Sequence, residues 1–282
     1  MENINRGKLY IVGTPIGNLG DLSPRALDIL ANVDFIAAED TRVTLRLLNH
    51  FGVKKPLTSY HEHNAREAGE RIVARLLAGE TAALVTDAGM PAISDPGEAL
   101  VRLCHERGAA VESVPGPSAL VTALALSGMP SGRFCFEGFL TVNRSGRRAR
   151  LKELAAEPRT MIFYEAPHKL LCTLRDMLES LGDRPVCLVR ELTKLHEEAI
   201  PTTLSAAVEK YESTPPKGEF VLVVGGAQTE VSTSLTPADG ARLAAVLMEQ
   251  GLSPSSAAKE AAARTGCKKG DIYRLLMEWN AE

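Results

Sequence analysis

Several polar loops along the chain follow short apolar runs and carry residue types that could bind a ligand. The densest is TDAGMPAISDPG, residues 86–97, which follows the apolar run at residues 82–86. Its prolines restrict the backbone, so main-chain groups are left free to bind a ligand. In α/β sheets ligands bind beyond the carboxyl ends of strands, which favours a ligand-binding loop over an ordinary connection here.

A glycine-rich segment, GTPIGNLG at residues 13–20, follows the first apolar run. Its glycines let the backbone approach a ligand, and the next helix N-terminus favours an anionic group. The spacing is not G-x-G-x-x-G, so the dinucleotide fingerprint is absent. Glu39 and Asp40 follow about 20 residues later, where a Rossmann protein binds a ribose. The alternative is a plain turn with Asp40 as helix cap before Thr41, and the sequence leaves both open.

Three further loops stand just after strand-like runs. VPGPSA, residues 114–119, places Ser118 at a helix start, where it could be only an N-cap. FYEAPHK (163–169) and RELTK (190–194) occur in the second half of the chain. Each could be a surface loop, but together they place polar residues at strand ends in both halves. That is where a cleft between two domains would lie.

A basic stretch occupies residues 142–152, VNRSGRRARLK, and contains no acidic residue. Its positive side chains are Arg144, Arg147, Arg148, Arg150 and Lys152. In an otherwise acidic chain they predict a local anion-binding patch that could contact a phosphate backbone. The alternative is a solvated helix face.

Composition excludes several classes of protein. The chain has 282 residues, with 32 Lys and Arg against 35 Asp and Glu, so a strongly basic polyanion binder is excluded. Aromatic residues make up only 5%, which argues against a base-stacking surface. The five scattered cysteines predict free thiols in a reducing compartment and no zinc site. We find no GxSxG, HExxH or Walker A motif, and His61-Glu62-His63 is a poor metal site because residues i and i+2 project to opposite sides of a strand.

No signal peptide and no apolar run of about 18 residues is found, so we expect a cytoplasmic protein without a membrane span. Strands are expected near residues 9–12, 35–38, 56–60, 82–86, 111–114, 134–140, 161–164, 186–189 and 220–224, with helices between most of them. One of these helices is expected to open at Asp95-Pro96. This alternation predicts α/β layers with a largely parallel sheet in each half.

We expect three domains. An N-terminal α/β domain covers residues 1–120, a second α/β domain 121–230, and a small helical domain 235–282, with the first junction inside residues 115–130. The last piece has three expected helices and a turn at Thr265-Gly266, as in a helix-turn-helix. Its charges balance, with six basic and six acidic residues. Both a packing or dimer-contact bundle and a nucleic-acid reader remain open.

In order, GTPIGNLGDLSPRAL (13–27), AAEDTR (37–42), TDAGMPAISDPG (86–97), VPGPSAL (114–120), FYEAPHK (163–169) and RELTK (190–194) closely resemble one family. It is the family of bacterial 16S ribosomal RNA ribose 2′-O-methyltransferases I, in the tetrapyrrole methylase superfamily. The resemblance covers roughly residues 7–226. It implies two α/β domains of tetrapyrrole-methylase type with a cofactor cleft between them, plus a small C-terminal helical appendix.

The resemblance also implies S-adenosylmethionine as cofactor, the ribose 2′-hydroxyl of a decoding-centre cytidine in 16S rRNA of the small ribosomal subunit as substrate, and a cytoplasmic homodimer. Met90 stands where the family often has Thr, so a backbone contact would survive there but a hydroxyl contact would not. Carried over by motif, the cofactor-binding positions are Thr14, Pro15, Asp87, Ala88, Gly89, Met90, Ile93, Ser118, Ala119, Tyr164, Glu165 and Leu192.

A sulfonium methyl donor is already activated, so neither a metal nor a nucleophilic side chain is needed. A ribose hydroxyl is a poor acid at neutral pH, so a general base or a nearby positive charge would help. The candidates are Glu39, Asp40, His61 and Lys194, in no fixed order. Alternative functions are a methylase of a tetrapyrrole-like small molecule, a non-catalytic RNA- or ribosome-binding protein that uses the helical tail, and a nicotinamide-dependent oxidoreductase.

Overall fold

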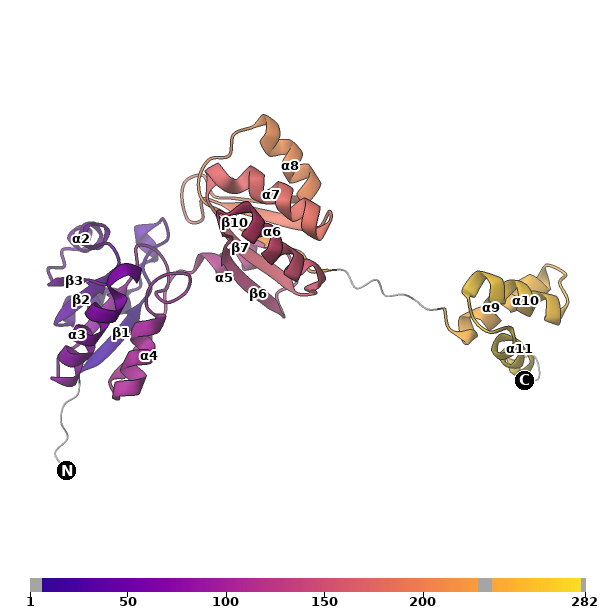
Figure 1. The fold of residues 1–282 in the computed structure, drawn as a ribbon, viewed down its shortest axis with the longest axis horizontal. Coiled ribbons are helices and arrows are strands. Elements are labelled where there is room, and N and C mark those ends of the chain that lie inside the picture. Colours follow the sequence, from indigo (N-terminus) through magenta and orange to yellow (C-terminus); the bar gives the residue numbers. More distant parts are fainter. Residues whose placement is uncertain (1–6, 228–234, 280–282) are drawn as a thin grey trace, which may run out of the picture. The chain divides into compact units, whose positions relative to one another are not determined.

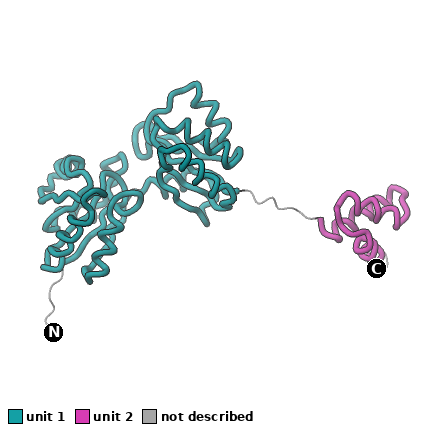
Figure 2. Tube along the Cα trace, viewed as in Figure 1, with its two compact units in different colours: residues 1–227 teal, residues 228–282 magenta. Residues whose placement is uncertain are grey.

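Two five-stranded sheets and a group of three short helices make up the described part of the chain in the computed structural model, residues 7–227 and 235–279 (Figure 1). The chain divides into two units, residues 1–227 and 228–282 (Figure 2). Both sheets belong to the first unit, and the three helices belong to the second.

The first sheet has the strand order β3-β2-β4-β1-β5, and all its pairs are parallel. Its strands are β1 (Lys8–Val12), β2 (Phe35–Ala38), β3 (Leu57–Ser59), β4 (Ala82–Val85) and β5 (Ala110–Val114). The helices between them are η1 (Leu19–Asp21), α1 (Pro24–Asn32), α2 (Thr41–His50), η2 (Glu62–Asn64), α3 (Ala65–Leu77) and α4 (Glu98–Arg107). The parallel sheet expected for the first half is confirmed.

Helices cover both faces of this sheet, so β2 and β4 are buried at every residue. Phe35 and Ala37 pack in one cluster with residues of α3 and α4. Ile36 and Ala38 pack in another cluster with residues of α1 and α2. The sheet is thereby fixed from both sides, and its carboxyl edge carries the loops that follow β1, β2, β4 and β5.

The loop after β4 is longer than expected. The helix expected to open at Asp95-Pro96 begins at Glu98 instead, and Gly97 is its N-cap with φ of 151°. Ala92 and Ser94 also have positive φ, of 66° and 67°. Asp95 therefore lies in the loop and not in the first turn of a helix.

The second sheet has the strand order β6-β7-β10-β8-β9 and is mixed. Its strands are β6 (Phe134–Phe139), β7 (Thr160–Glu165), β8 (Pro185–Arg190), β9 (Glu198–Thr203) and β10 (Phe220–Val224). Only β6 and β7 run parallel, whereas β10 is antiparallel to both β7 and β8, and β8 is antiparallel to β9. The largely parallel sheet expected for the second half is therefore wrong.

Strand β9, with sequence EAIPTT, has no counterpart among the expected strands. It has no apolar run, it contains Pro201, and it lies at the edge of the sheet. Proline is tolerated in an edge strand because its missing N–H faces away from the partner strand. The short connection at residues 191–197 turns the chain back on itself, so β8 and β9 pair antiparallel.

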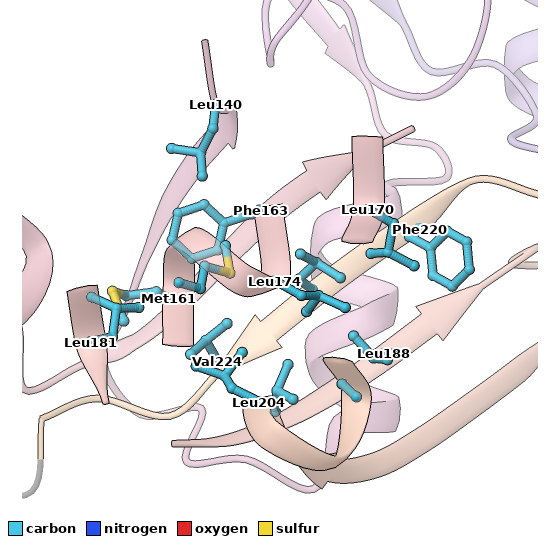
Figure 3. Close-up of a cluster of buried hydrophobic side chains, with 14 of the residues drawn as sticks. Leu140, Met161, Phe163, Leu170, Leu174, Leu181, Leu188, Leu204, Phe220 and Val224 are labelled. Carbon is cyan, nitrogen blue, oxygen red and sulfur yellow. The ribbon is translucent and has the colours of Figure 1, made fainter. Parts of the chain in front are cut away.

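Helices α6 (Arg144–Glu153), η3 (Leu154–Ala156), α7 (Pro167–Leu181) and α8 (Leu204–Ser213) follow β6, β7 and β9. Met161, Phe163, Leu188 and Leu222 pack against Leu174 of α7 and other helical residues on one face of the sheet (Figure 3). The opposite face packs against α5 (Ala119–Ser127), through residues that include Ala123 and Leu124. Helix α5 thus belongs to the second sheet, and the chain crosses from one half to the other at the loop before it.

The second unit contains α9 (Pro237–Glu249), α10 (Pro254–Thr265) and α11 (Lys269–Trp279), which confirms the three expected helices. Alanines form much of its core, among them Ala241, Ala244, Ala257 and Ala261. Small side chains let the helix axes approach closely. Gly266 ends α10 with φ of 71°, which places the turn where Thr265-Gly266 was expected to form it.

Candidate active site

A cavity of about 340 Å³ lies between the two halves of the first unit, and both halves line it. Its volume falls in the range of about 300–1,000 Å³ that small-molecule sites occupy. The first half contributes Ile16, Glu39, Asp87, Ala88, Gly89, Met90, Ile93, Asp95 and Ser118, and Ala119 is the first residue of α5, which packs on the second sheet. The second half contributes Phe139, Tyr164, Glu165, Ala166, Val189, Leu192, Lys194, Glu219, Phe220 and Val221.

Ten of the twelve expected cofactor positions line this cavity, and Thr14 and Pro15 do not. These two line a neighbouring pocket of about 260 Å³ with Leu19 and Val43. The buried Thr14 hydroxyl donates to the carbonyl of Thr86 over 3.1 Å. Thr14 thus holds the loop after β4 in place from outside the cavity.

Two glycines bring the loops after β1 and β5 into direct contact. A Cβ atom added to Gly116 would lie 2.8 Å from the Cα of Gly13, and one added to Gly13 would lie 2.7 Å from the Cα of Gly116. The backbones of Thr14 and Gly89 exchange hydrogen bonds of 2.9 and 3.1 Å. The loops after β1, β4 and β5 therefore form one packed group beside the cavity.

The two halves also meet without room for an extra atom. A Cβ atom added to Gly17 would lie 2.6 Å from Cγ of Lys194 and 3.0 Å from the carbonyl oxygen of Leu192. Within the second half, the backbone N–H of Leu120 on α5 donates to the hydroxyl of Tyr164 over 3.1 Å. Phe139 lies edge-on to the Tyr164 ring with centroids 5.5 Å apart. These contacts fix Tyr164 at the wall of the cavity.

Three carboxylates from the first half line the cavity, and their pKa values are raised. Burial, followed by the charge of Asp87, raises the pKa of Glu39. Burial raises the pKa of Asp87. The backbone N–H of Asp40 acts to lower this pKa, whereas the charge of the Asp40 carboxylate acts to raise it. Burial, then Glu39 and Asp87, raises the pKa of Asp95 to about 6. This wall therefore favours a bound cation, which would relieve the repulsion.

Asp40 does not line the cavity. It is the N-cap of α2, accepting from the N–H of Arg42 over 2.8 Å. The guanidinium of Arg42 binds the same carboxylate, and these hydrogen bonds lower the pKa of Asp40 to about 2. A carboxylate so strongly stabilised in its ionised form is a weak base.

Lys194 lines the cavity from the second half and is held by two carboxylates. Its Nζ donates to Glu191 over 3.1 Å and to Glu219 over 3.0 Å. Burial acts to lower the pKa of Lys194, but the hydrogen bonds to Glu219 and Glu191 outweigh it and raise the pKa. Lys194 is therefore a cation at neutral pH, suited to attract negative charge and not to accept a proton.

His61 stands outside the cavity lining, although its charge acts on Glu39. Its Nδ1 is buried and has no hydrogen-bond partner among the described residues. Of the four candidate bases, the structure therefore places Glu39 and Lys194 at the cavity wall and Asp40 and His61 away from it.

The basic stretch forms most of α6, and its positive side chains differ in exposure. Arg147 is 5% exposed, and its guanidinium donates to the buried Asp176 from Nε over 2.8 Å and from Nη2 over 2.6 Å. Arg148 pairs with Glu179, and Arg150 pairs with Glu137 and Glu153. Arg147 thus anchors α6 to α7 and is not available to an RNA phosphate.

Arg150 is exposed but is held by its two glutamate partners, so Arg144 and Lys152 are the exposed positive side chains of this stretch that are bound least. Arg144 Nε lies 3.5 Å from Asp176 with 70% of its side chain exposed. Lys152 is exposed and makes no ion pair with any residue the structure describes. Any anion-binding patch on α6 is therefore smaller than the count of its charges indicates.

Several lining residues have no signal in the sequence. Phe220 and Val221 belong to an apolar strand with the composition of ordinary core, and Val189 is equally inconspicuous. The position of Asp95 in the loop at residues 86–97 indicated a binding residue. However, an Asp-Pro pair is also typical of a helix start, which was the structure expected there.

Within residues 7–227 and 235–279, no group of three or more His, Cys, Asp or Glu residues is placed so that it could hold a metal ion. The carboxylates of the cavity wall are therefore not arranged as a metal site. In the same described ranges we find no helix that is long and apolar enough to span a membrane.

Two families match the chain. The family described as Tetrapyrrole (Corrin/Porphyrin) Methylases matches residues 8–208, and that described as RsmI C-terminal HTH domain matches residues 234–280. A Ribosomal RNA small subunit methyltransferase I from Xylella fastidiosa is 50% identical over 270 residues, covering 95% of this chain and 98% of that protein. A protein of the same name from Thermotoga maritima is 50% identical over 220 residues, covering 78% of this chain and 99% of its own length.

Solved structures show the same fold. Uroporphyrin-III C-methyl transferase from Thermus thermophilus, complexed with S-adenyl homocysteine, matches with a TM-score of 0.55 and 20% identity, covering 78% of this chain and 97% of that chain. The two-domain α/β fold with a C-terminal helical appendix, which the resemblance implied, is confirmed.

Proposed function

Since the chain belongs to the tetrapyrrole methylases and, within them, to the ribosomal RNA small subunit methyltransferase I family, we propose that it transfers a methyl group from S-adenosylmethionine to a ribose 2′-hydroxyl of 16S rRNA. The target that the sequence motifs imply is a decoding-centre cytidine. With rRNA of the small ribosomal subunit as partner, the protein would work in the cytoplasm, and we expect it to act as a homodimer.

The observation that carries the proposal is the cavity itself. It brings together the loops after β2, β4 and β5 with the ends of β7, β8 and β10, and its first-half wall carries the carboxylates of Glu39 and Asp87. S-adenosylmethionine has a sulfonium and an ammonium group, so a wall of carboxylates with raised pKa values suits its positive charge. Apolar residues such as Met90, Ile93 and Leu192 fill out the remaining wall and exclude water from the bound donor.

When bound, the donor supplies an activated methyl group, so the residues of this chain have to position it and manage a proton. The packed loops after β1, β4 and β5 fix the donor side of the site, and Tyr164 and Lys194 fix the opposite wall. Holding two reactants in line can account for about 7–11 kcal/mol of barrier lowering. The positive charge of Lys194 also suits an oxygen that becomes negative as its proton leaves.

The direct test is methyl transfer to the proposed substrate. Small ribosomal subunits and free 16S rRNA, both from cells that lack this protein, are incubated with the purified chain and S-adenosylmethionine carrying a tritiated methyl group. We expect label in a ribose-methylated cytidine, identified by nuclease digestion and mass spectrometry. Label on a base, or transfer to uroporphyrinogen and not to RNA, would contradict the proposal and favour the small-molecule alternative.

The second unit gives a prediction about which part of the chain binds the donor and which part contributes to rRNA binding. The described residues that line the cavity all belong to the first unit, between Ile16 and Val221, and the core described for the second unit is made of that unit's residues. Deleting residues 235–282 should leave the Kd for S-adenosylmethionine within about threefold and weaken binding to the rRNA substrate at least tenfold, by titration calorimetry and filter binding. The Thermotoga relative, with a match of 220 residues, supports the first part. A truncated chain that no longer binds the donor would contradict it.

The exposed charges of α6 give a second prediction. The double variant Arg144→Glu and Lys152→Glu should weaken rRNA binding about tenfold and reduce its salt dependence, since each phosphate contact contributes about 0.9 to the salt slope. Donor affinity should not change, because neither residue lines the cavity. Lys54→Glu, an exposed charge reversal in the first half, is the matched control. Equal RNA affinity of the double variant and the control would remove α6 from the RNA-binding surface.

A further inference from the structure

Five carboxylates line the cavity, and four of them are already engaged. The backbone N–H of Asp87 donates to Glu39, and the backbone N–H of Asp40 donates to Asp87 over 3.2 Å. Glu219 accepts from Lys194 over 3.0 Å. These bonds tie up part of the lone-pair capacity that a base would need.

Glu165 is the fourth engaged carboxylate. It is 3% exposed and accepts from the hydroxyl of Thr173 over 2.5 Å and from the N–H of Ala166 over 2.9 Å. These bonds hold it at the start of α7. Among the described residues that line the cavity, Asp95 is the carboxylate without a hydrogen bond or ion pair.

The backbone around Asp95 is held in a costly conformation. Ala92 and Ser94 have positive φ values of 66° and 67°, a conformation that residues other than glycine rarely adopt. Gly97 has φ of 151°, and a Cβ atom there would lie 2.9 Å from the backbone nitrogen of Ala92. Pro96 restricts Asp95 itself to an extended backbone. Such strain persists where surrounding structure fixes a functional geometry, and here it fixes a carboxylate.

The charged and titratable groups around Asp95 come from both halves. Glu39 and Asp87 face it from the loops after β2 and β4, and both repel its negative form. Tyr164 faces it from β7, and its own pKa is raised by burial and also by the charge of Asp95. With the pKa of Asp95 at about 6, the carboxylate is ionised at neutral pH and holds a proton more readily than an ordinary aspartate. Those are the properties of an effective general base.

We propose that Asp95 is the general base that accepts the proton of the ribose 2′-hydroxyl during methyl transfer. The O–H bond breaks and its proton passes to an Asp95 carboxylate oxygen, as the ribose oxygen forms a bond to the methyl carbon. The bond between sulfur and that carbon breaks, and its electron pair stays on sulfur, leaving a neutral thioether. Asp95 then releases the proton to water. The inference rests on the proposed function, because it assigns a role within that reaction.

The residues that the sequence offered as bases fit the role less well. Asp40 is stabilised as an anion by Arg42 and stands outside the cavity lining, as does His61. Lys194 is held in its charged form by Glu191 and Glu219. Glu39 remains at the wall, but the N–H of Asp87 stabilises its anion. Glu39 thus serves to raise the proton affinity of Asp95.

The test is Asp95→Asn, which keeps the size of the side chain and removes its basicity. We expect kcat with saturating rRNA and donor to fall about 10²–10⁴-fold, the usual contribution of a general base. The Kd for S-adenosylmethionine should stay within about threefold. Asp95→Glu, which retains a carboxylate, should be more active than Asp95→Asn. Asp28→Asn, an exposed residue on α1, is the matched control and should behave as the unmodified protein.

The pH profile gives a readout on the unmodified protein. Its kcat/KM for the donor, which reports groups of the free enzyme, should fall about tenfold per pH unit below a pKa near 6. Asp95→Asn should lose this acidic limb. Because the fold raises the pKa of Asp95, its ionised form costs stability above the unfolded pKa. Asp95→Asn should therefore be at least as thermostable as the unmodified protein at pH 8.

The outcomes separate this inference from the function on which it rests. If the unmodified chain transfers no methyl group to 16S rRNA, the proposed function fails. If it does, and Asp95→Asn keeps kcat within threefold, the role of Asp95 as base is refuted. A large rise in donor Kd with unchanged kcat at saturation would also overturn it, because Asp95 would then bind the donor. An acidic limb that persists in Asp95→Asn assigns the base to another group.

Discussion

Replacing Gly116 by alanine is expected to lower kcat/KM for methyl transfer about 100-fold and to weaken donor binding at least tenfold. The added Cβ would lie 2.8 Å from the Cα and the carbonyl oxygen of Gly13, which is closer than packed atoms allow. Both contacts are to backbone, so no side chain can rotate away. The ends of β1 and β5 must separate instead, and Gly13 is bonded to Val114 of β5 through a backbone hydrogen bond of 3.2 Å.

That separation would reach the cavity through neighbouring contacts. Thr14, next to Gly13, exchanges backbone hydrogen bonds with Gly89, which lines the cavity, as does Ser118, two residues after Gly116. A displacement of about 1 Å in a site can cost 10²-fold in rate. The overpacking itself should cost about 1–3 kcal/mol of stability.

Calorimetric titration with S-adenosylmethionine and steady-state kinetics measure this effect. Gly132→Ala is the matched control, because a Cβ atom there meets nothing within 4 Å and its φ is not positive. Wild-type donor affinity in Gly116→Ala would mean that the two loops can move apart without disturbing the site, against our description of them as one packed group.

Replacing Asp176 by alanine should lower the free energy of unfolding of the first unit by about 3–5 kcal/mol, the cost of leaving a buried charge without its partner. Only 6% of the Arg147 side chain and 3% of the Asp176 side chain are exposed. The remaining guanidinium nitrogen, Nη1, donates to the carbonyl of Val142 over 3.3 Å and to that of Thr141 over 3.4 Å, so all three nitrogens are bound to protein oxygens.

Removing both charges should be less costly than removing one. The double variant Arg147→Met and Asp176→Leu leaves no unpaired buried charge, so its loss should be smaller than the sum of the two single losses. Arg175→Met, whose exposed guanidinium pairs with Glu212, is the control and should cost less than about 1 kcal/mol. Differential scanning calorimetry of the full chain measures Asp176→Ala, the single variants Arg147→Met and Asp176→Leu, the double variant and the control. Additive losses would show that the pair is not energetically coupled.

The first sheet could be predicted from the sequence because its strands are buried on both faces. Runs such as FIAA and AALV have no polar alternation, and each is followed by a helical pattern, which indicates parallel strands under two helix layers. The second sheet could not be predicted in the same way. Apolar runs such as VCLV in β8 look alike whether their neighbours are parallel or antiparallel, and the direction depended on β9, whose sequence EAIPTT carries no strand signal.

Some residues of the candidate site could be predicted from the sequence and others could not. Asp87, Gly89 and Ser118 could be predicted because glycine, proline and aspartate after a buried strand indicate a binding loop. Phe220 and Val221 could not, because their side of the cavity is made by strand residues whose composition is that of any core. Arg147 shows a further limit of prediction from sequence. The sequence shows that a positive residue is present, but not that it is buried and paired with Asp176 on another helix.

The carboxylates of Glu39 and Asp87 have a consequence for turnover under the proposed reaction. Before transfer they face a positively charged donor, and afterwards the sulfur is neutral while the rest of the molecule is unchanged. The attraction between these carboxylates and the donor therefore weakens when the methyl group leaves. The same wall that favours binding of the donor favours release of the demethylated product. The demethylated donor should therefore bind more weakly than the donor, which limits product inhibition when both are present together.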